Sequence, residues 1–244
     1  MSETSSAHTS PTTAYWQTLL PGWPGGVPPA PPFGLDYPAR LPDGRMLVLP
    51  LRRLPEGRQA VASLIANQAS FAVVAALSDH MADLARATDA DLVVGMPTLG
   101  LTFAPLVAER LGHARYVPLG YSRKFWYDDA LSEPIFSITS PSGEKRLYLD
   151  PNVVPLLKGR RVCMVDDAVS TGSSVLAGYR LFARLGIDFT AVIVAMKQTT
   201  RWRKPVGDVS PALRDSVRAV FACPLFEEKG DGWMPIAGTL PDVP

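Results

Sequence analysis

Two adjacent carboxylates and the loop of small residues behind them are the groups in this sequence best suited to chemistry. Asp166 and Asp167 end an apolar run at residues 162–165 and precede a stretch of serine, threonine and glycine. Ionised carboxylates only accept hydrogen bonds, so the pair suits vicinal sugar hydroxyls rather than a phosphate group. Residues 175–185 have a helical pattern, and the free N–H groups at a helix start favour an anion. The combination predicts a site for a phosphorylated sugar.

The loop between the acidic pair and the helix supplies neutral donors. Its hydroxyl groups can donate to an anion, and Gly172 lets the backbone approach closely and take a positive φ. An ordinary buried strand with a polar turn that caps the helix is the alternative. The residues expected to hold the phosphate group are Ala168, Val169, Ser170, Thr171, Gly172, Ser173 and Ser174.

The order of these features resembles the phosphoribosyl-pyrophosphate (PRPP) signature of the type I phosphoribosyltransferases. In that family four apolar residues precede two acids, and a loop with Thr-Gly ends in Thr or Ser. The stretch from Val162 to Ser174 meets each condition. The resemblance covers residues 59–197 and, in loop order, is nearest to the adenine and xanthine enzymes. It implies that Asp166 and Asp167 are catalytic residues that contact the ribose hydroxyls.

The pattern of the whole chain favours an α/β fold. Apolar strands are expected at residues 91–95, 115–119, 162–165 and 189–196, and helices at residues 59–87, 103–111 and 175–185. This alternation predicts a parallel sheet flanked by helices, with ligands beyond the carboxyl ends of the strands. The resemblance implies the type I phosphoribosyltransferase fold, with a variable hood built from the termini.

Composition divides the chain into three parts. Residues 1–38 are rich in Pro and Ser, which predicts a tail that is disordered or extended over a surface. Residues 39–200 are the expected phosphoribosyltransferase core, with a hairpin at residues 39–50 and a flexible lid at about 125–150. Residues 201–244 are the expected C-terminal hood or extension, irregular apart from an apolar run at residues 217–226.

A second loop follows the strand expected at residues 91–95. Thr98, Leu99 and Gly100 lie between this strand and a helix, so an anion can bind there. In the family the equivalent loop binds pyrophosphate through backbone amides and often contains a cis peptide bond before a residue other than proline. A plain strand-to-helix turn is the alternative.

Four cations complete the expected pyrophosphate site. Arg123 and Lys124 match in position an Arg-Lys pair that meets pyrophosphate in adenine phosphoribosyltransferases, and they are predicted as catalytic residues. Solvated surface charges are the alternative. In the lid, Lys145 and Arg146 are expected to reach the leaving pyrophosphate when the lid closes over the reacting centre.

The residues that recognise the base are the hardest to place. Lys197 follows a strand where hypoxanthine-guanine enzymes use a lysine, and Trp202 could stack on a base. A surface lysine and a surface loop are the respective alternatives. Thr139 and Ser140 stand where adenine enzymes carry a Glu-Tyr pair, which puts adenine in doubt. Ser170 replaces an aspartate of the hypoxanthine-guanine enzymes, which argues against that branch.

The overall composition narrows the protein class. The chain has 244 residues, of which 47% are hydrophobic and 19% charged, enough for a packed core. A net charge of +1 gives no bulk attraction to nucleic acid. Cys163 and Cys223 are expected to be reduced core residues without a metal. Without a secretory leader or a long apolar run, we expect a cytoplasmic protein with no membrane contact.

The resemblance implies a pentosyltransferase of purine salvage. It would move the 5-phosphoribosyl group of PRPP to a ring nitrogen of a nucleobase, with a purine as the expected base, and release pyrophosphate. Mg²⁺ is expected to bind mainly through PRPP and pyrophosphate, with no metal site on the protein. A homodimer is expected. The alternative is a PRPP-sensing regulator without catalysis, which would act through a protein partner because the Pro-rich start cannot form a helix-turn-helix.

Overall fold

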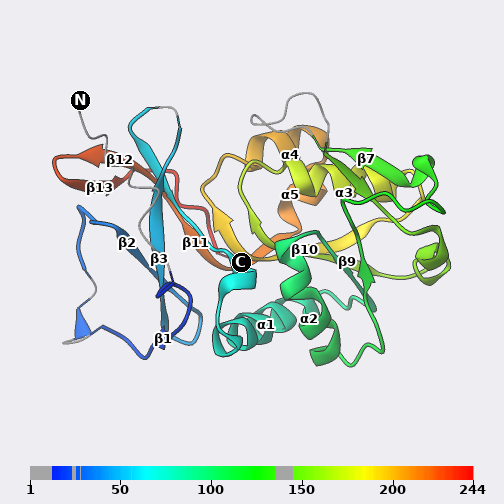
Figure 1. Cartoon of the computed structure of the whole chain (residues 1–244), viewed down its shortest axis with the longest axis horizontal. Helices are drawn as coiled ribbons and strands as arrows, with labels where there is room; N and C mark the ends of the chain where they lie inside the picture. Colours follow the sequence, from blue (N-terminus) through cyan, green and yellow to red (C-terminus); the bar gives the residue numbers. More distant parts are fainter. Residues whose placement is uncertain (1–12, 24–25, 28, 56, 136–144, 244) are drawn as a thin grey trace.

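The computed structural model of the chain has a parallel core at one end and an antiparallel hood at the other (Figure 1). It describes residues 13–23, 26–27, 29–55, 57–135 and 145–243. Thr139 and Ser140, expected in the lid, lie outside the described residues.

The core sheet is entirely parallel, which confirms the predicted fold class. From β5 the chain passes to β6 on one side and then to β9 on the other. The strand order therefore reverses between β5 and β9, and this is where open α/β sheets bind ligands. In spatial order the strands are β11 (Val217–Cys223), β10 (Phe189–Gln198), β9 (Val162–Val169), β5 (Leu92–Gly95) and β6 (Val117–Pro118).

Helices cover both faces of this sheet because its strands are apolar on both sides. In β9, Cys163 packs in the hydrophobic cluster that contains helices α1 and α2, whereas Met164 packs in the cluster that contains α3 to α5. Cys163 and Cys223 are both buried and free. The helices are α1 (Phe71–Arg86) and α2 (Ala104–Arg110) on the first face, and α3 (Ser173–Ala183), α4 (Arg203–Val209) and α5 (Pro211–Asp215) on the second.

The hood combines strands from both ends of the chain. The hairpin expected at residues 39–50 is confirmed as β2 and β3, and β4 joins β3 to β12. Trp16 is 2% exposed and donates from Nε1 to the carbonyl of Ser63, so the N-terminal segment packs on its own chain. The hood strands are β1 (Leu19–Leu20), β2 (Asp36–Arg40), β3 (Met46–Arg53), β4 (Gln59–Ala62), β12 (Leu225–Lys229) and β13 (Gly232–Pro235).

A two-stranded ribbon stands at the base of the expected lid. Strands β7 (Ser132–Pro134) and β8 (Arg146–Tyr148) pair on either side of residues 136–144. Backbone hydrogen bonds in both directions join Gly120 to Tyr148 and fix the ribbon to the end of β6. Four 3₁₀ helices complete the described elements: η2 (Ala66–Gln68), η3 (Leu99–Thr102), η4 (Asp129–Leu131) and η5 (Pro151–Leu156).

Three expected elements differ from the structure. The helix expected from residue 59 begins only at Phe71, because Ser70 caps it by accepting from the Val73 N–H at 3.2 Å. The strand expected to end before the aspartates continues to Val169, because β10 pairs with it along this length. The C-terminal part is not irregular, since it contains α4, α5 and three strands.

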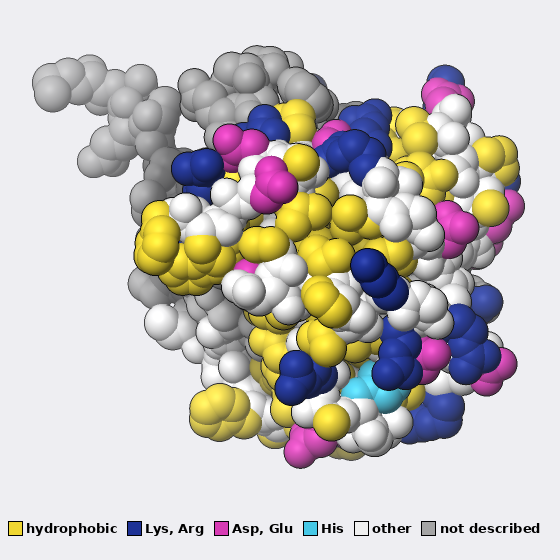
Figure 2. Space-filling model, turned by 90° about the vertical axis from the view of Figure 1, so that its right-hand side faces the viewer, with side chains coloured by type: hydrophobic (Ala, Val, Ile, Leu, Met, Phe, Trp, Pro, Cys, Tyr) yellow, Lys and Arg dark blue, Asp and Glu magenta, His cyan; other side chains and the backbone are white. Residues whose placement is uncertain are grey.

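Two further features are the hydrophobicity of the helices and the distribution of charged side chains on the surface. In the part of the chain that it describes, no helix has the length and apolar character needed to cross a membrane. Figure 2 shows the core end of the molecule, where lysine and arginine side chains are interspersed with hydrophobic and acidic ones.

Candidate active site

The loops after β5 and β9 meet at Gly100. A Cβ atom on Gly100 would lie 2.8 Å from both Cα and Oδ1 of Asp166, and 2.9 Å from the carbonyl oxygen of Val165. The N–H of Met96 also donates to the Val165 carbonyl at 2.9 Å. The expected pyrophosphate loop and the acidic pair are therefore in direct contact, at the point where the strand order reverses.

The two aspartates are joined by a hydrogen bond, and Asp166 is the buried member of the pair. Asp166 is 5% exposed, and its Oδ1 accepts the N–H of Asp167 at 2.9 Å. Burial and the neighbouring Asp167 carboxylate raise the pKa of Asp166 well above its usual range. Burial raises the pKa of Asp167 as well. The unliganded pair therefore resists double ionisation, and hydroxyl donors from a ligand would stabilise its charged form.

The loop of residues 168–174, expected to hold the phosphate group and called the phosphate loop below, leads into a helix with free N–H donors. Gly172 has φ 84° and precedes α3, and no side chain caps this helix. The first N–H groups of α3 are therefore open to an anion, unlike those of α1. The hydroxyl oxygens of Thr171 and Ser173 lie 2.9 Å apart. Val169 is 1% exposed and packs in the core, so only its backbone can take part.

The expected pyrophosphate loop begins with an unusual backbone. The peptide bond between Pro97 and Thr98 is cis, as the family resemblance implies for this loop. Leu99 and Gly100 then start η3, and Gly100 is buried against the acidic pair. Of the three predicted residues, Gly100 is therefore the one in contact with the acidic pair.

Two of the predicted cations make other contacts, and a third is exposed. Arg123 is exposed and forms an ion pair from Nε to Oδ1 of Asp129 at 2.8 Å, and Lys124 is exposed beside it. Arg146 donates from Nη2 to Oγ of Ser132 at 2.7 Å, across the β7–β8 ribbon. Among the described residues, no hydrogen bond or ion pair joins these cations to the acidic pair.

Lys145 does lie near the acidic pair, and Tyr121 lies with it. Nζ of Lys145 is 3.8 Å from the centroid of the Tyr121 ring, and its charge opposes the upward pKa shift of Asp166. Burial, Asp166 and Asp167 raise the pKa of Tyr121 to about 12, against a hydrogen bond with Ser174. Sequence reasoning missed Tyr121, whose only signal was its position just after a strand.

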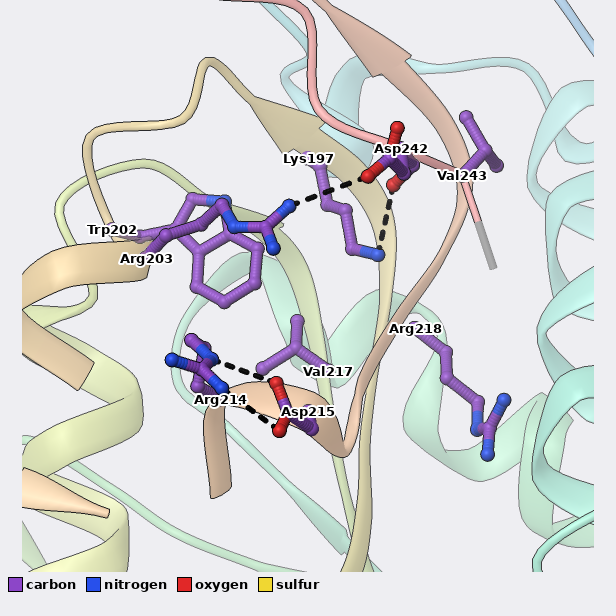
Figure 3. A pocket seen from close by; sticks show the side chains of 9 residues that line it. All are labelled: Lys197, Trp202, Arg203, Arg214, Asp215, Val217, Arg218, Asp242 and Val243. Atoms are coloured by element: carbon purple, nitrogen blue, oxygen red, sulfur yellow. Dashed lines mark hydrogen bonds and ion pairs between the residues drawn. The ribbon is translucent and has the colours of Figure 1, made fainter. Parts of the chain in front are cut away.

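Lys197 and Trp202 share a separate cavity of about 200 Å³ beside β10, β11, α4 and α5 (Figure 3). Both are buried, at 6% and 2% exposure, so neither is a surface residue. Nζ of Lys197 donates to the carbonyl oxygen of Asp242 at 3.1 Å, and Arg203 pairs with the Asp242 carboxylate at 3.5 Å. Burial, with Arg203 as a further cause, lowers the pKa of Lys197 to about 8. The cavity shares no lining residue with the phosphate loop.

Comparisons with known proteins agree with this arrangement. The model of the phosphoribosyl transferase domain family matches residues 60–225. A protein named adenine phosphoribosyltransferase, from Novosphingobium aromaticivorans, is 32% identical over 121 residues, which are 48% of this chain and 62% of that protein. One of the same name from Thermotoga petrophila is 31% identical over 52% of this chain and 68% of its own length. The match thus spans less than two thirds of the first relative's length and slightly more than two thirds of the second's.

Solved structures share the fold. The adenine phosphoribosyltransferase of Rhodothermus marinus has a TM-score of 0.53 and 17% identity, over 70% of this chain and 93% of its own. The enzyme of Giardia lamblia, complexed with 9-deazaadenine, gives the same TM-score, identity and coverage.

Proposed function

Because this chain belongs to the phosphoribosyltransferase family, we propose that it transfers the 5-phosphoribosyl group of PRPP to a ring nitrogen of a purine base and releases pyrophosphate. One observation carries the proposal: an uncapped helix start, the pair Asp166–Asp167 and the loop that contains Gly100 converge between β5 and β9. These are the groups needed to hold a 5′-phosphate, two ribose hydroxyls and a pyrophosphate.

The residues of the chain would act mainly by positioning. The amides after Gly172 hold the 5′-phosphate, and Asp166 and Asp167 accept hydrogen bonds from the ribose hydroxyls. The ring nitrogen forms a bond to C1 of the ribose while the bond from C1 to the pyrophosphate oxygen breaks, pyrophosphate leaves with that electron pair, and the ring N–H proton passes to water or to pyrophosphate. Positive charge that develops on the sugar lies near the aspartates. Catalysis then comes from orientation and electrostatic stabilisation.

The pyrophosphate would be held by the loop of residues 98–100 together with cations. Lys145 already lies by the acidic pair. Arg123 and Lys124 remain proposed ligands, because the Arg123–Asp129 ion pair is exposed and its exchange for pyrophosphate costs little. Arg146 would have to leave Ser132 to take part.

Magnesium is the cofactor that this chemistry implies. Among the described residues there is no group of three or more His, Cys, Asp or Glu side chains that could hold a metal ion alone. Asp166 and Asp167 offer hard oxygen donors, which fit an ion held largely by substrate oxygens and water. Mg²⁺ bound in this way would neutralise charge on the pyrophosphate.

The relatives named adenine phosphoribosyltransferases make adenine the first base to test. Lys197 and Trp202 remain proposed base contacts, but a contact from Lys197 requires its hydrogen bond to Asp242 to be exchanged. The names of the relatives also favour an enzyme over the alternative of a PRPP-sensing regulator.

The deciding experiment is pyrophosphate release from PRPP and Mg²⁺ with adenine, guanine, hypoxanthine, xanthine, uracil or orotate in turn. We expect release that depends on a purine, and its loss in the Asp167→Asn variant. Binding of PRPP without release for any base would support the regulator instead, and no PRPP binding would refute both.

We also retain the homodimer and the cytoplasmic location as proposals. Exposed large apolar side chains support the dimer, since Phe71 is 95% and Phe125 is 93% exposed. Light scattering coupled to gel filtration would test it, and a monomer at all concentrations would refute it.

A further inference from the structure

Thr199 has a backbone conformation that its residue type disfavours. It follows β10, is fully buried and has φ 64°. A β-branched residue in the left-handed region is a genuine outlier, and such residues cluster at functional sites. The N–H of Thr199 donates to the carbonyl of Cys223 at 2.9 Å, so the neighbouring strand helps to hold this turn.

The turn at Thr199 directs the side chain of Arg201. Oγ1 of Thr199 accepts from both the backbone N–H and the Nε–H of Arg201, each at 3.3 Å. The guanidinium then reaches the phosphate loop, where its Nη2 lies 3.4 Å from Oγ of Ser170. One buried hydroxyl thus fixes both the backbone and the head of Arg201 toward that loop.

The segment that carries Arg201 is packed against the phosphate loop itself. A Cβ atom on Gly172 would lie 2.6 Å from Cγ2 of Val206 and 3.5 Å from Cβ of Trp202. The distance between Arg201 and the start of α3 is therefore set by close packing of α4.

Arg201 places a positive charge beside a loop that has none of its own. The hollow of the phosphate loop is lined by residues 168–175, which are all neutral, while a phosphate monoester carries close to two negative charges at pH 7. The acidic pair directly precedes this loop and supplies no positive charge to it. Within the described parts of the chain, Arg201 forms no ion pair and is held only by neutral hydroxyls. Its charge is available to an anion in the hollow.

We propose that Arg201 binds the 5′-phosphate directly and determines specificity for a phosphorylated sugar, with Thr199 as its positioning residue. This inference rests on the proposed function, because it places the 5′-phosphate in the loop of residues 168–174. When the phosphate binds, Ser170 donates its hydroxyl to the anion, and the Arg201 N–H groups exchange Ser170 for phosphate oxygens. A guanidinium offers two donors in the fixed geometry that suits this exchange.

The test is calorimetric titration of ribose 5-phosphate, and separately of pyrophosphate with Mg²⁺, into the full chain. Loss of a hydrogen bond to a charged group predicts that Arg201→Gln weakens ribose 5-phosphate about 10- to 150-fold and leaves pyrophosphate within about twofold. Thr199→Val keeps the side-chain shape without the hydroxyl. We expect it to weaken ribose 5-phosphate selectively as well, but by a smaller factor than Arg201→Gln. Lys204→Gln is the matched control, since it removes an exposed cation of the same segment that pairs with Asp208.

The outcomes separate the inference from the proposed function. If Arg201→Gln binds ribose 5-phosphate as the wild type does, or loses affinity for both ligands equally, the inference is wrong while the proposed function stands. If wild-type protein binds neither PRPP nor ribose 5-phosphate, the proposed function fails first. Unchanged thermal unfolding of the variants confirms that the comparison is between folded proteins, and Arg201 is exposed, so its replacement leaves the core intact.

Discussion

Replacement of Gly100 by alanine tests whether contact between the two ligand loops sets PRPP affinity. The added Cβ would lie 2.8 Å from Cα and Oδ1 of Asp166 and 2.9 Å from the Val165 carbonyl. Two of these atoms belong to the backbone of a central strand and cannot rotate away. Gly100 has no positive φ, so steric contact is the cause of any effect.

The size of the effect follows from the crowding. Overpacking a close contact costs about 1–3 kcal/mol, and if this displaces the acidic pair from the ribose, PRPP affinity falls about 5- to 150-fold. Calorimetric titration of PRPP into the protein, with Mg²⁺ present, measures this affinity. Thermal unfolding checks that the variant is folded.

A glycine in a neighbouring loop provides the control. A Cβ on Gly120 would meet nothing within 4 Å, and its φ is also not positive. Gly120→Ala should therefore bind PRPP within about twofold of the wild type. If a folded Gly100→Ala variant binds PRPP as well as Gly120→Ala does, the loops do not depend on each other and the reasoning is refuted.

Two further predictions concern the acidic pair and the residues beside it. Asp166→Asn should weaken PRPP about tenfold or more yet stabilise the unliganded protein near pH 8. The folded pair keeps a proton to higher pH than an unfolded aspartate, so wild-type stability falls as pH rises from about 4 through the raised pKa, and the variant lacks this fall. Thermal unfolding across pH measures it, and parallel curves for both proteins would refute the assignment. Tyr121→Leu removes the ring beneath Lys145 and should weaken pyrophosphate about 2- to 30-fold, whereas Tyr121→Phe should not. The loss should vanish in a Lys145→Met background, and a loss that persists there would show that Tyr121 does not act through Lys145.

The fold was predictable where a local pattern determined the element. Cys163 and Met164 pack on opposite faces of β9, as an apolar run in a parallel sheet requires. The start of α1 could also have been read from Ser70, which is a favoured capping residue, and the start of α5 from Ser210 followed by Pro211. The strand β4 was less readable, because only its partner β3 is near in sequence and its other partner, β12, comes from the far end of the chain.

The candidate site was predictable to a similar extent. Gly100 follows β5 and meets Asp166 of β9, and Gly172 lies in the loop after β9, so the order of strands and loops placed all three near the same end of the sheet. The direction of Lys197 depends on Asp242, a residue distant in sequence, so no local signal could give it. The direction of the Arg201 side chain was equally unpredictable, since the Ser170 hydroxyl that it contacts lies on another loop.

The most direct measurement is a crystal structure of the chain with PRPP and Mg²⁺. We predict that the 5′-phosphate lies on the amides that follow Gly172 and that both ribose hydroxyls donate to Asp166 and Asp167. A ligand bound elsewhere, with this loop empty and the aspartates turned into the scaffold, would contradict the account.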